Sequence, residues 1–464
     1  MSTRRLFERT ASYAADFVES LSTRPVEARA GADELRAALG GPLPEHPLDP
    51  EQVVTELAEA ADPGVVGMAG GRYFGFVIGG GLPAAVAADW LASVWDQNAG
   101  LYVAGPSAAV VEEVALEWLR ELLGLPEGVS AGFVTGCQLA HVTALAAARR
   151  HVLHDVGWDV GRDGLGGAPR VRVLAGEQRH VTVDRALRLL GLGTASVESI
   201  PADDQGRMLV EPLVRALART DGPTIVCAQL GNVNTGAFDP LPPIADAAQE
   251  AGAWLHVDGA FGMWAAASPK LRHLCAGVER ADSWAMDTHK WLNVPYDSGI
   301  AFCAHPESHR AAMTVHADYL IQEDAGGRRD AVDWVPEASR RARGFAVYAA
   351  LRSLGRSGVA GLVERSCECA RLFAERLGEV EGAEILNDVV LNQVLVRIVD
   401  GRTTDEVMRL VRESGEAWMG GTQWGGESAM RISVSNWRTS ADDVERAVGA
   451  IRQAASIAAR NVAT

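Results

Sequence analysis

Hydrophobic and polar positions alternate in two different ways along this chain. Between residues 132 and 303, short apolar runs alternate with segments whose apolar residues recur at helical spacing. Seven such runs are present, at 132–135, 171–174, 197–200, 224–229, 254–257, 283–286 and 300–303. Runs of this length between amphipathic segments predict parallel strands joined by crossover helices. We therefore expect a large α/β domain whose ligands bind beyond the carboxyl ends of the strands.

The two flanks of this region follow other patterns. The N-terminal part predicts helical pieces broken by a proline-rich stretch at 41–50, with a glycine cluster at 70–81. The C-terminal part predicts a helix, short strands at 389–396 and 430–434, and a final helix, which together suggest a smaller α/β domain. The expected organisation is a helical N-terminal segment at 1–100, a large domain at 101–345 and a small C-terminal domain at 346–464.

Composition adds limits on location and partners. Hydrophobic residues make up 48% and charged residues 22% of the 464 residues, as in ordinary soluble globular proteins. The formal net charge of -17 argues against binding to nucleic acid or to an anionic membrane. No apolar run approaches the roughly 20 residues of a membrane helix, and residues 1–10 lack the apolar core of a signal peptide. We therefore expect a cytoplasmic protein with no membrane or nucleic-acid partner.

The cysteines give no sign of a metal site. They are scattered along the chain, several lie in apolar runs, and none shows the paired spacing of a zinc ligand set. We expect six reduced thiols, at Cys137, Cys227, Cys275, Cys303, Cys367 and Cys369, and no bound metal.

Lys290 carries the clearest chemical signal. It follows the apolar run 283–286 in the segment Asp-Thr-His-Lys-Trp-Leu at 287–292. Lysines are almost never fully buried unless they have a charged partner or a covalent role. Burial lowers the pKa of a lysine and leaves a neutral amine that can attack an aldehyde. Taken alone, the segment fits a surface lysine in the turn after a strand equally well.

Asp258 ends the apolar run 254–257 and precedes Lys290 by 32 residues. A carboxylate against the nitrogen of a pyridine ring keeps that nitrogen protonated, and the ring then withdraws electrons from the carbon that reacts. An aspartate before a glycine is also common as an N-cap or turn residue. A cofactor role for Asp258 becomes convincing only together with its position relative to Lys290.

Three further segments lie at the ends of expected strands. Gly136 separates the run 132–135 from a long helical pattern, and the free N–H groups at such a helix N-terminus bind phosphate. His180 could lie flat over a cofactor ring, or it could be structural. Asn232, in an Asn/Gly-rich turn, could lie beside a ring oxygen or serve only the turn. The order of phosphate turn, histidine, Asn/Gly turn, aspartate and lysine is far more specific than any one member.

This ordered set resembles the group II decarboxylases that depend on pyridoxal 5'-phosphate (PLP). That family includes the aromatic amino-acid and glutamate decarboxylases and has fold type I. The resemblance runs from about residue 70 to about residue 443, and its most specific motifs are the His-Val-Asp segment at 256–258 and the His-Lys-Trp segment at 289–291. It implies PLP as cofactor, a mostly parallel seven-stranded sheet flanked by helices, and a homodimer with active sites at the subunit interface.

The resemblance also implies roles for single residues. Lys290 matches the lysine that holds PLP as a Schiff base, and Asp258 matches the partner of the ring nitrogen. His180 matches the histidine stacked on the ring, and Ala260 the small residue packed against it. The other residues expected at the cofactor are Gly136, Cys137 and Gln138 in the phosphate-binding turn, together with Asn232, Asp287 and His289.

The resemblance extends to the substrate side of the site. Tyr319 matches the tyrosine of a mobile loop that protonates the substrate carbon after CO2 leaves, although it could also be a packing aromatic. Family members that oxidise the substrate to an aldehyde have phenylalanine there, so Tyr319 favours simple decarboxylation. The charged stretch 322–330 fits such a loop. Residues expected near the substrate are Tyr73, Phe74, Phe76, His289 and Arg431. The aromatics favour an aromatic L-amino acid, whereas Arg72, if it pointed inward, would suit an acidic one.

Three positions depart from the family pattern. Cys137 is a weak donor where serine or glycine is usual, and His141 stands in place of an asparagine. Asp287 stands where many members have asparagine, and its charge could repel phosphate. The Asp-Thr-His-Lys form is similar to sphingosine-phosphate lyases, which cleave a carbon–carbon bond on the same fold. A PLP-dependent carbon–carbon lyase or aldolase is therefore the main alternative, and aminotransfer and a non-catalytic scaffold are two others.

The expected reaction uses three of these side chains. The substrate amine displaces Lys290 from PLP, and the bond to the carboxylate is set perpendicular to the ring. CO2 leaves as electrons flow into the ring with the help of Asp258. Tyr319 then returns a proton to the substrate carbon from a loop that closes and excludes water, and Lys290 releases the amine.

Overall fold

The computed structural model describes residues 2–219, 222–314 and 328–462. It divides into two compact units. One unit comprises Gly79–Glu368 and Asn387–Gln393, and the other comprises Met1–Ile78, Cys369–Leu386 and Val394–Thr464. The three-domain division expected from the sequence stays a prediction.

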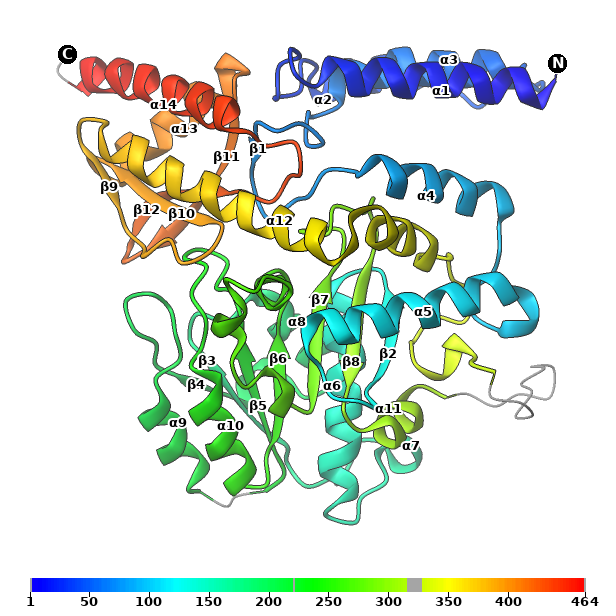
Figure 1. Cartoon of the computed structure of the whole chain (residues 1–464), viewed down its shortest axis with the longest axis vertical. Helices are drawn as coiled ribbons and strands as arrows, with labels where there is room; N and C mark the ends of the chain where they lie inside the picture. The colour runs from blue at the N-terminus through cyan, green and yellow to red at the C-terminus, as the bar shows by residue number, and fades with distance from the viewer. Residues whose placement is uncertain (1, 220–221, 315–327, 463–464) are drawn as a thin grey trace. The chain divides into compact units, whose positions relative to one another are not determined.

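The larger unit is built on a seven-stranded sheet with the strand order β2-β8-β7-β6-β5-β3-β4 (Figure 1). β8 runs antiparallel to both β2 and β7, and the other neighbouring pairs are parallel. This arrangement confirms the mostly parallel sheet predicted from the alternating pattern. The strands are β2 (Ser130–Val134), β3 (Arg172–Gly176), β4 (Val197–Ile200), β5 (Thr224–Gln229), β6 (Trp254–Asp258), β7 (Ser283–Asp287) and β8 (Gly299–Cys303).

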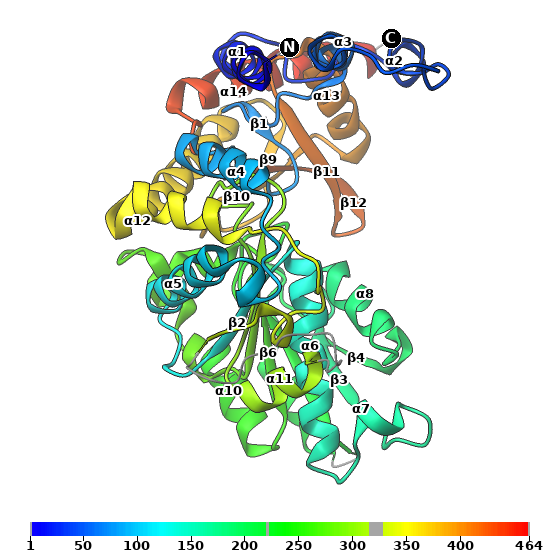
Figure 2. The ribbon, with the colours of Figure 1, turned by 90° about the vertical axis from the view of Figure 1, so that its right-hand side faces the viewer.

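Helices cover both faces of this sheet. Figure 2 shows α6 and α8 on one side of the strands and α5 and α10 on the other. Every residue of β5, β6 and β7 is buried, as expected for strands of a parallel sheet with helices on both faces. The helices are α4 (Pro83–Trp95), α5 (Pro106–Leu123), α6 (Cys137–His154), α7 (Val160–Asp163), α8 (Val181–Leu189), α9 (Val210–Leu217), α10 (Leu241–Glu250) and α11 (Pro306–Met313).

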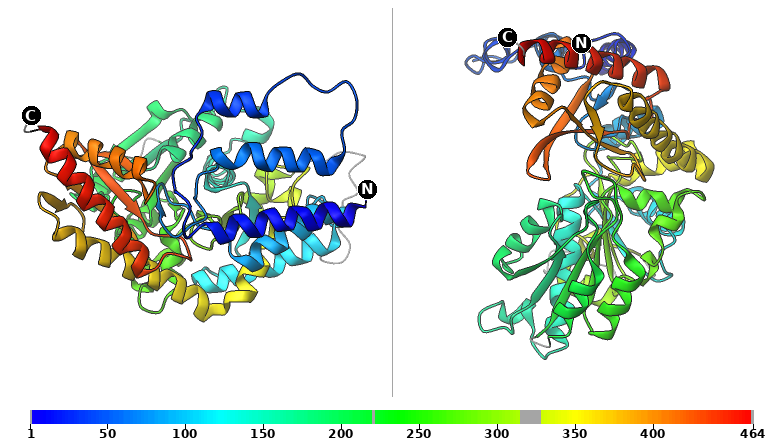
Figure 3. Two further views of the ribbon diagram at one scale, coloured as in Figure 1. Left: turned by 90° about the horizontal axis from the view of Figure 1, so that it is seen from above. Right: turned by 90° about the vertical axis from the view of Figure 1, so that its left-hand side faces the viewer.

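The second unit contains a five-stranded sheet with the order β1-β11-β12-β10-β9. β1 comes from the N-terminal part of the chain and pairs in parallel with β11, so that Tyr73 lies opposite Trp418. α13 packs against α14 and against strands β11 and β12 of this sheet (Figure 3). The strands are β1 (Tyr73–Phe74), β9 (Ala383–Ile385), β10 (Gln393–Ile398), β11 (Trp418–Trp424) and β12 (Glu427–Ser433).

Among the described residues, five α-helices belong to the second unit, and the residues of one further α-helix are divided between the two units. The five are α1 (Thr3–Ser20), α2 (Ala32–Leu39), α3 (Pro50–Ala61), α13 (Gly401–Ser414) and α14 (Ala441–Val462). α12 (Gly344–Gly378) is interrupted at Gly355, whose φ of 61° and ψ of 178° are not helical. The short 3-10 helices are η1 (Asp62–Gly64), η2 (Tyr102–Ala104), η3 (Thr194–Ser196), η4 (Gly262–Ala267), η5 (Arg272–Cys275), η6 (Val278–Arg280) and η7 (Ala331–Asp333). Among the described helices, none is both long and apolar enough to cross a membrane.

Candidate active site

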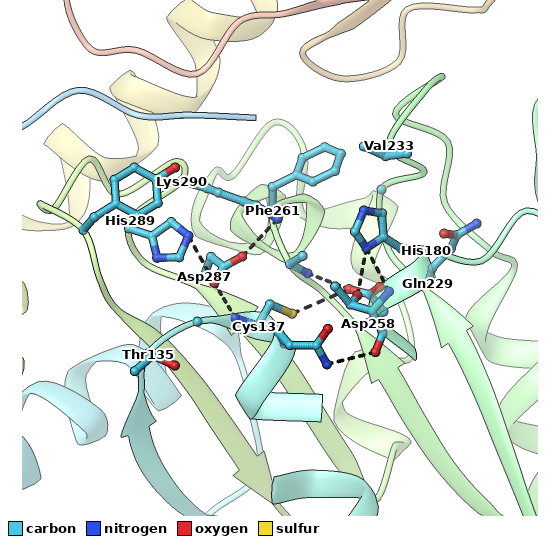
Figure 4. A pocket seen from close by; sticks show the side chains of 16 residues that line it. Thr135, Cys137, His180, Gln229, Val233, Asp258, Phe261, Asp287, His289 and Lys290 are labelled. Carbon is cyan, nitrogen blue, oxygen red and sulfur yellow. Dashed lines mark hydrogen bonds and ion pairs between the residues drawn. The ribbon is translucent and has the colours of Figure 1, made fainter. Parts of the chain in front are cut away.

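A cavity of about 370 Å³ lies within the larger unit, at the carboxyl ends of its sheet strands (Figure 4). Its walls come from the turn between β2 and α6, the ends of β5, β6 and β7, the start of α8 and the loop after β7. The lining residues are Thr135, Gly136, Cys137, Gln138, His180, Thr182, Gln229, Gly231, Val233, Asp258, Ala260, Phe261, Asp287, His289, Lys290 and Tyr296. The structure thus brings together nine of the ten residues that the sequence predicts to bind the cofactor.

Lys290 is the lysine of this cavity, and the sequence contains one other, Lys270. The Lys270 side chain is 70% exposed and pairs with Glu364 at 2.8 Å. Lys290 Nζ lies 3.0 Å from Asp287 Oδ2. Burial by itself would lower the pKa of Lys290, but the interactions with Asp287, Cys137 and Asp258 together outweigh burial and raise it. This corrects the sequence argument, which considered burial alone and expected a neutral amine.

Asp258 ends β6 and is almost fully buried. Its Oδ1 accepts the backbone N–H of Ala260 at 3.1 Å, and its Oδ2 lies 3.5 Å from Nε2 of His141. Burial opposes ionisation of this carboxyl group, but the charges of His141 and His180 and the hydrogen bonds from His141 and the backbone N–H of Ala260 hold its pKa well below the usual range. Asp258 is therefore an ionised carboxylate at the edge of the cavity.

The turn between β2 and α6 places a helix N-terminus in the cavity. A side chain at Gly136 would put its Cβ 3.1 Å from His289 and 3.3 Å from Asp287 Oδ1, so the backbone approaches these residues closely because Gly136 has none. The N–H of Cys137, the first residue of α6, donates to Asp287 Oδ1 at 2.6 Å. Gln138 Oε1 is buried without a hydrogen-bond partner among the described residues. The backbone N–H groups at the start of α6 form an anion site of the kind found at helix N-termini.

His180 lies at the N-cap of α8 and faces the cavity. Its Nδ1 lies 2.8 Å from Oγ1 of Thr182 and accepts the backbone N–H of the same residue at 3.4 Å. Figure 4 shows His180, Asp258 and Lys290 around the same cavity. The capping contacts fix the plane of the imidazole before any ligand enters.

His289 and Tyr296 form the wall next to Lys290. Nδ1 of His289 accepts the backbone N–H of Ser298 at 3.1 Å, and its ring lies 4.3 Å from the ring of Tyr296. Burial lowers the pKa of His289, although the charge of Asp287 opposes this effect. Tyr296 could not be predicted from the sequence, because a single tyrosine in an irregular loop follows no periodic pattern.

Asn232 does not line the cavity. Its Oδ1 accepts the backbone N–H groups of Asn234 and Thr235, and its Nδ2 donates to the carbonyl of Gln178 at 3.2 Å. The side chain thus stabilises its own turn, while the neighbouring residues Gly231 and Val233 face the cavity. The local alternative for Asn232, a role only in the turn, agrees with these contacts.

Four residues expected near the substrate belong to the second unit. Tyr73 and Phe76 stack on Trp418 with ring centroids 5.0 and 5.6 Å apart, and Phe74 packs edge-on against Phe373 at 4.8 Å. Arg431 is largely buried, and burial lowers its pKa. Their roles toward a substrate stay predictions.

Arg72 has structural contacts within the second unit. Its guanidinium donates to the carbonyls of Glu416 at 2.6 Å and of Arg24 at 2.9 Å. The guanidinium of Arg72 is therefore held by backbone carbonyls. Arg72 then gives no support for an acidic substrate. Tyr319 and most of the stretch 322–330 lie outside the described residues.

The groups in the cavity fit PLP. A lysine amine lies in one cavity with an ionised carboxylate, a helix N-terminus and a histidine whose ring plane is fixed. The amine, the carboxylate and the helix N-terminus match the aldehyde, ring nitrogen and phosphate of that cofactor.

The fold and this cavity define a PLP-dependent enzyme of fold type I. The pyridoxal-dependent decarboxylase conserved domain matches residues 33–399, and the chain belongs to this family of PLP-dependent amino-acid decarboxylases. The match confirms PLP as the cofactor and decarboxylation as the reaction class, in preference to the carbon–carbon lyase alternative.

Relatives with assigned names match the chain along nearly its whole length. Tryptophan decarboxylase 1 of Oryza sativa subsp. japonica is 27% identical over 93% of this chain and 90% of that protein. The aromatic-L-amino-acid decarboxylase of Bacillus atrophaeus is 28% identical over 92% of this chain and 90% of that protein. The structure of Oryza sativa TDC with PLP and tryptamine superposes with a TM-score of 0.91 at 25% identity and covers 98% of this chain and 97% of that one. The phenylacetaldehyde synthase of Arabidopsis thaliana is 24% identical over 96% of this chain and 94% of that protein.

Proposed function

We propose that this enzyme converts an aromatic L-amino acid into the corresponding amine and CO2, with PLP held on Lys290. The observation that carries the proposal is the meeting of Lys290, ionised Asp258 and the N-terminus of α6 in one cavity. The aromatic class is supported by relatives named as tryptophan and aromatic-amino-acid decarboxylases.

Four residues of the cavity have a task around the aldehyde and the ring of the cofactor. Lys290 supplies the amine that holds the cofactor aldehyde, and Asp258 places a negative charge opposite the ring nitrogen. His180 supports the ring face, and Ala260 leaves room beside it. When bound, PLP supplies an electron-withdrawing ring that takes up the electrons left when CO2 departs.

The phosphate end of the cofactor would be held by backbone N–H groups. Cys137 and Gln138 begin α6, so their N–H groups carry the positive end of the helix dipole. The N–H of Cys137 donates to Asp287 in this structure, so a phosphate must share that donor with the carboxylate or displace it. His289 lies beside Lys290 and would meet the reacting part of the substrate.

We propose Tyr319 as the acid that returns a proton to the substrate carbon. The family resemblance supports this role, because members that form aldehydes have phenylalanine at the matching position. An aldehyde product is the second candidate, since relatives named as phenylacetaldehyde synthases match this chain over a similar length. The tyrosine favours the amine.

The resemblance also supports a homodimer with active sites at the subunit interface. A cytoplasmic location is proposed from the absence of apolar runs of membrane length in the sequence. The net charge of -17 supports the proposal that neither nucleic acid nor an anionic membrane is a partner.

The test is an assay of purified protein with added PLP against L-tryptophan, L-tyrosine, L-phenylalanine and L-glutamate. We expect CO2 and the amine in equal amounts from at least one aromatic substrate, with little aldehyde. Lys290→Ala should abolish both products, whereas Lys270→Ala, which changes the exposed lysine, should not. Amine from glutamate alone would contradict the aromatic class, and aldehyde with hydrogen peroxide as main products would contradict amine formation.

Borohydride reduction provides an independent test of the cofactor site. The chain has two lysines, so mass spectrometry of the reduced protein can assign the linkage without ambiguity. We expect one PLP group per chain, on Lys290. Labelling of Lys270 in place of Lys290 would contradict the site.

A further inference from the structure

Asp258 is the end of a chain of hydrogen bonds that runs away from the cavity. Its Oδ2 lies 3.5 Å from Nε2 of His141, whose Nδ1 lies 2.9 Å from Nε2 of His256. Nδ1 of His256 lies 2.9 Å from Oγ of Ser283, which also accepts from Nε1 of Trp254 at 2.9 Å. His141, His256 and Ser283 have no exposed surface, and none of the three lines the cavity.

The hydrogens at the two ends of this chain of hydrogen bonds have a fixed direction. An indole nitrogen can only donate, and an ionised carboxylate can only accept. Trp254 therefore donates to Ser283, and Nε2 of His141 carries the hydrogen that faces Asp258. Burial and the neighbouring His141 lower the pKa of His256 to about 3, so His256 is neutral and links Ser283 to His141.

A histidine at position 141 is unusual for the family that the sequence resembles. The family pattern has an asparagine there, and its shorter side chain places the amide nitrogen where Nδ1 of a histidine lies. Such a side chain could contact His256 but would fall short of Asp258. Nε2 of His141 is also 3.4 Å from Sγ of Cys137, so the ring fills the space between the helix N-terminus and the carboxylate.

Three buried polar groups in a row are costly unless each has a partner. In this series of hydrogen bonds each of the three buried groups has a partner. Together the contacts connect Trp254 to the carboxylate of Asp258, which faces the cavity. Burial raises the pKa of Asp258, whereas the charge and the hydrogen bond of His141 contribute to lowering it. A packing role alone would not require a donor aimed at Asp258.

We propose that His141 is a positioning residue that holds Asp258 ionised and oriented toward the ring nitrogen of PLP, and that His256 and Ser283 fix the ring of His141. The proposal rests on the PLP site and not on the identity of the substrate. The test measures cofactor binding and uses no substrate. A wrong substrate assignment would therefore leave its result unchanged, whereas a wrong role for His141 would change it.

Two variants separate the contacts of the imidazole. His141→Gln keeps an amide nitrogen near the place of Nε2 and retains the donor to Asp258. His141→Asn keeps a nitrogen near the place of Nδ1, toward His256, and loses that donor. His151→Gln is the matched control, because His151 lies on the same helix α6 and contacts Ser308 at 2.9 Å.

The measurements are the dissociation constant of PLP, from titration of the protein freed of cofactor, and the visible absorption band of the bound cofactor. A hydrogen bond to a charged group is worth roughly tenfold or more in binding. We expect His141→Asn to raise the dissociation constant by about tenfold and to shift the band. His141→Gln and His151→Gln should stay within about threefold of the parent and keep its band.

Equal losses in His141→Asn and His141→Gln would contradict the proposal, because they would indicate packing alone. Parent-like binding in His141→Asn, or a larger loss in His141→Gln, would contradict it as well. If His141→Asn does not fold, Ser283→Ala tests the far end of the chain instead. It should raise the dissociation constant by more than the roughly threefold range allowed for His151→Gln, and a constant within that range would overturn the proposal.

Discussion

Asp287 Oδ2 lies 3.0 Å from Nζ of Lys290, and Oδ1 of the same carboxylate accepts the N–H of Cys137 at 2.6 Å. The Asp287 carboxylate thus pairs with the charged amine of Lys290, which is proposed to hold PLP. It also occupies the helix N-terminus that is proposed to bind the phosphate of PLP. Both effects act before the cofactor binds. A carboxylate here favours a protonated lysine and competes with an anionic ligand.

Asp287→Asn should therefore strengthen PLP binding. The substitution removes one negative charge near the proposed phosphate site and lets the pKa of Lys290 fall, so more of the amine is neutral at a given pH. We expect the dissociation constant of PLP to fall by roughly fivefold at pH 7.5, equivalent to about 1 kcal/mol. Asp246→Asn, on an exposed residue paired with Arg280, is the control. Weaker binding in Asp287→Asn would show instead that the carboxylate orients the lysine.

Tyr319→Phe should change the product. If Tyr319 returns the proton to the substrate carbon, its loss leaves CO2 release possible and slows amine formation. We expect the ratio of aldehyde to amine to rise by about tenfold or more, measured by chromatography of both products from one reaction. Tyr348→Phe, on a tyrosine that packs against Trp118, is the control. An unchanged product ratio would assign the proton to another group.

The sequence was sufficient to locate the ends of the strands that carry the site. β6 and β7 are fully buried, so their apolar runs marked them, and Asp258 and Asp287 follow from where those runs stop. Parallel strands also align their carboxyl ends, so the meeting of Asp258 and Lys290 could be predicted from pattern alone.

Contacts between segments far apart in the sequence could not be predicted in this way. The bond from the N–H of Cys137 to Asp287 joins positions 150 residues apart, and it brings the carboxylate at the end of β7 to the N-terminus of α6. A pattern shows where a strand ends but not which side chain from another strand lies beside it. Asn232 is a different case, because an asparagine that bonds its own backbone two or three residues on is a local signal.

A buried ion pair should stabilise the frame behind the cavity. Nη1 of Arg340 lies 2.7 Å from Oε2 of Glu112, and Nη2 donates to the carbonyl of Phe133 on β2 at 2.6 Å. Glu112→Gln would leave a buried guanidinium without its counter-charge, at a cost of about 3 to 5 kcal/mol in the free energy of unfolding. Glu121→Gln lies on the same helix and breaks an exposed pair with Arg356, which should cost about 1 kcal/mol or less. Urea unfolding of the two variants measures the difference, and equal losses would contradict this account.

His309 should make the fold sensitive to mild acid. It is fully buried, with Nδ1 at 2.9 Å from Oγ of Ser130 and Nε2 at 2.8 Å from the carbonyl oxygen of Trp334. Burial lowers its pKa to about 4, the carbonyl of Trp334 opposes this effect, and the charge of Arg329 adds to it. In the unfolded chain the same imidazole takes up a proton near pH 6.5. Between these two pH values the unfolded state binds more protons than the folded state, so stability falls as the pH falls.

The loss expected from this one residue is about 3 kcal/mol between pH 7 and pH 4, because each unit of pKa difference is worth about 1.4 kcal/mol. His309→Gln keeps a donor for the carbonyl of Trp334 but cannot be protonated, so its stability should fall less over this range. His46→Gln, on an exposed histidine, should follow the parent. The measurement is the urea midpoint at pH 7, 6, 5 and 4 for the three proteins. Because other groups titrate equally in all of them, the difference between parent and His309→Gln isolates this imidazole, and parallel curves would mean that it is protonated in the folded state.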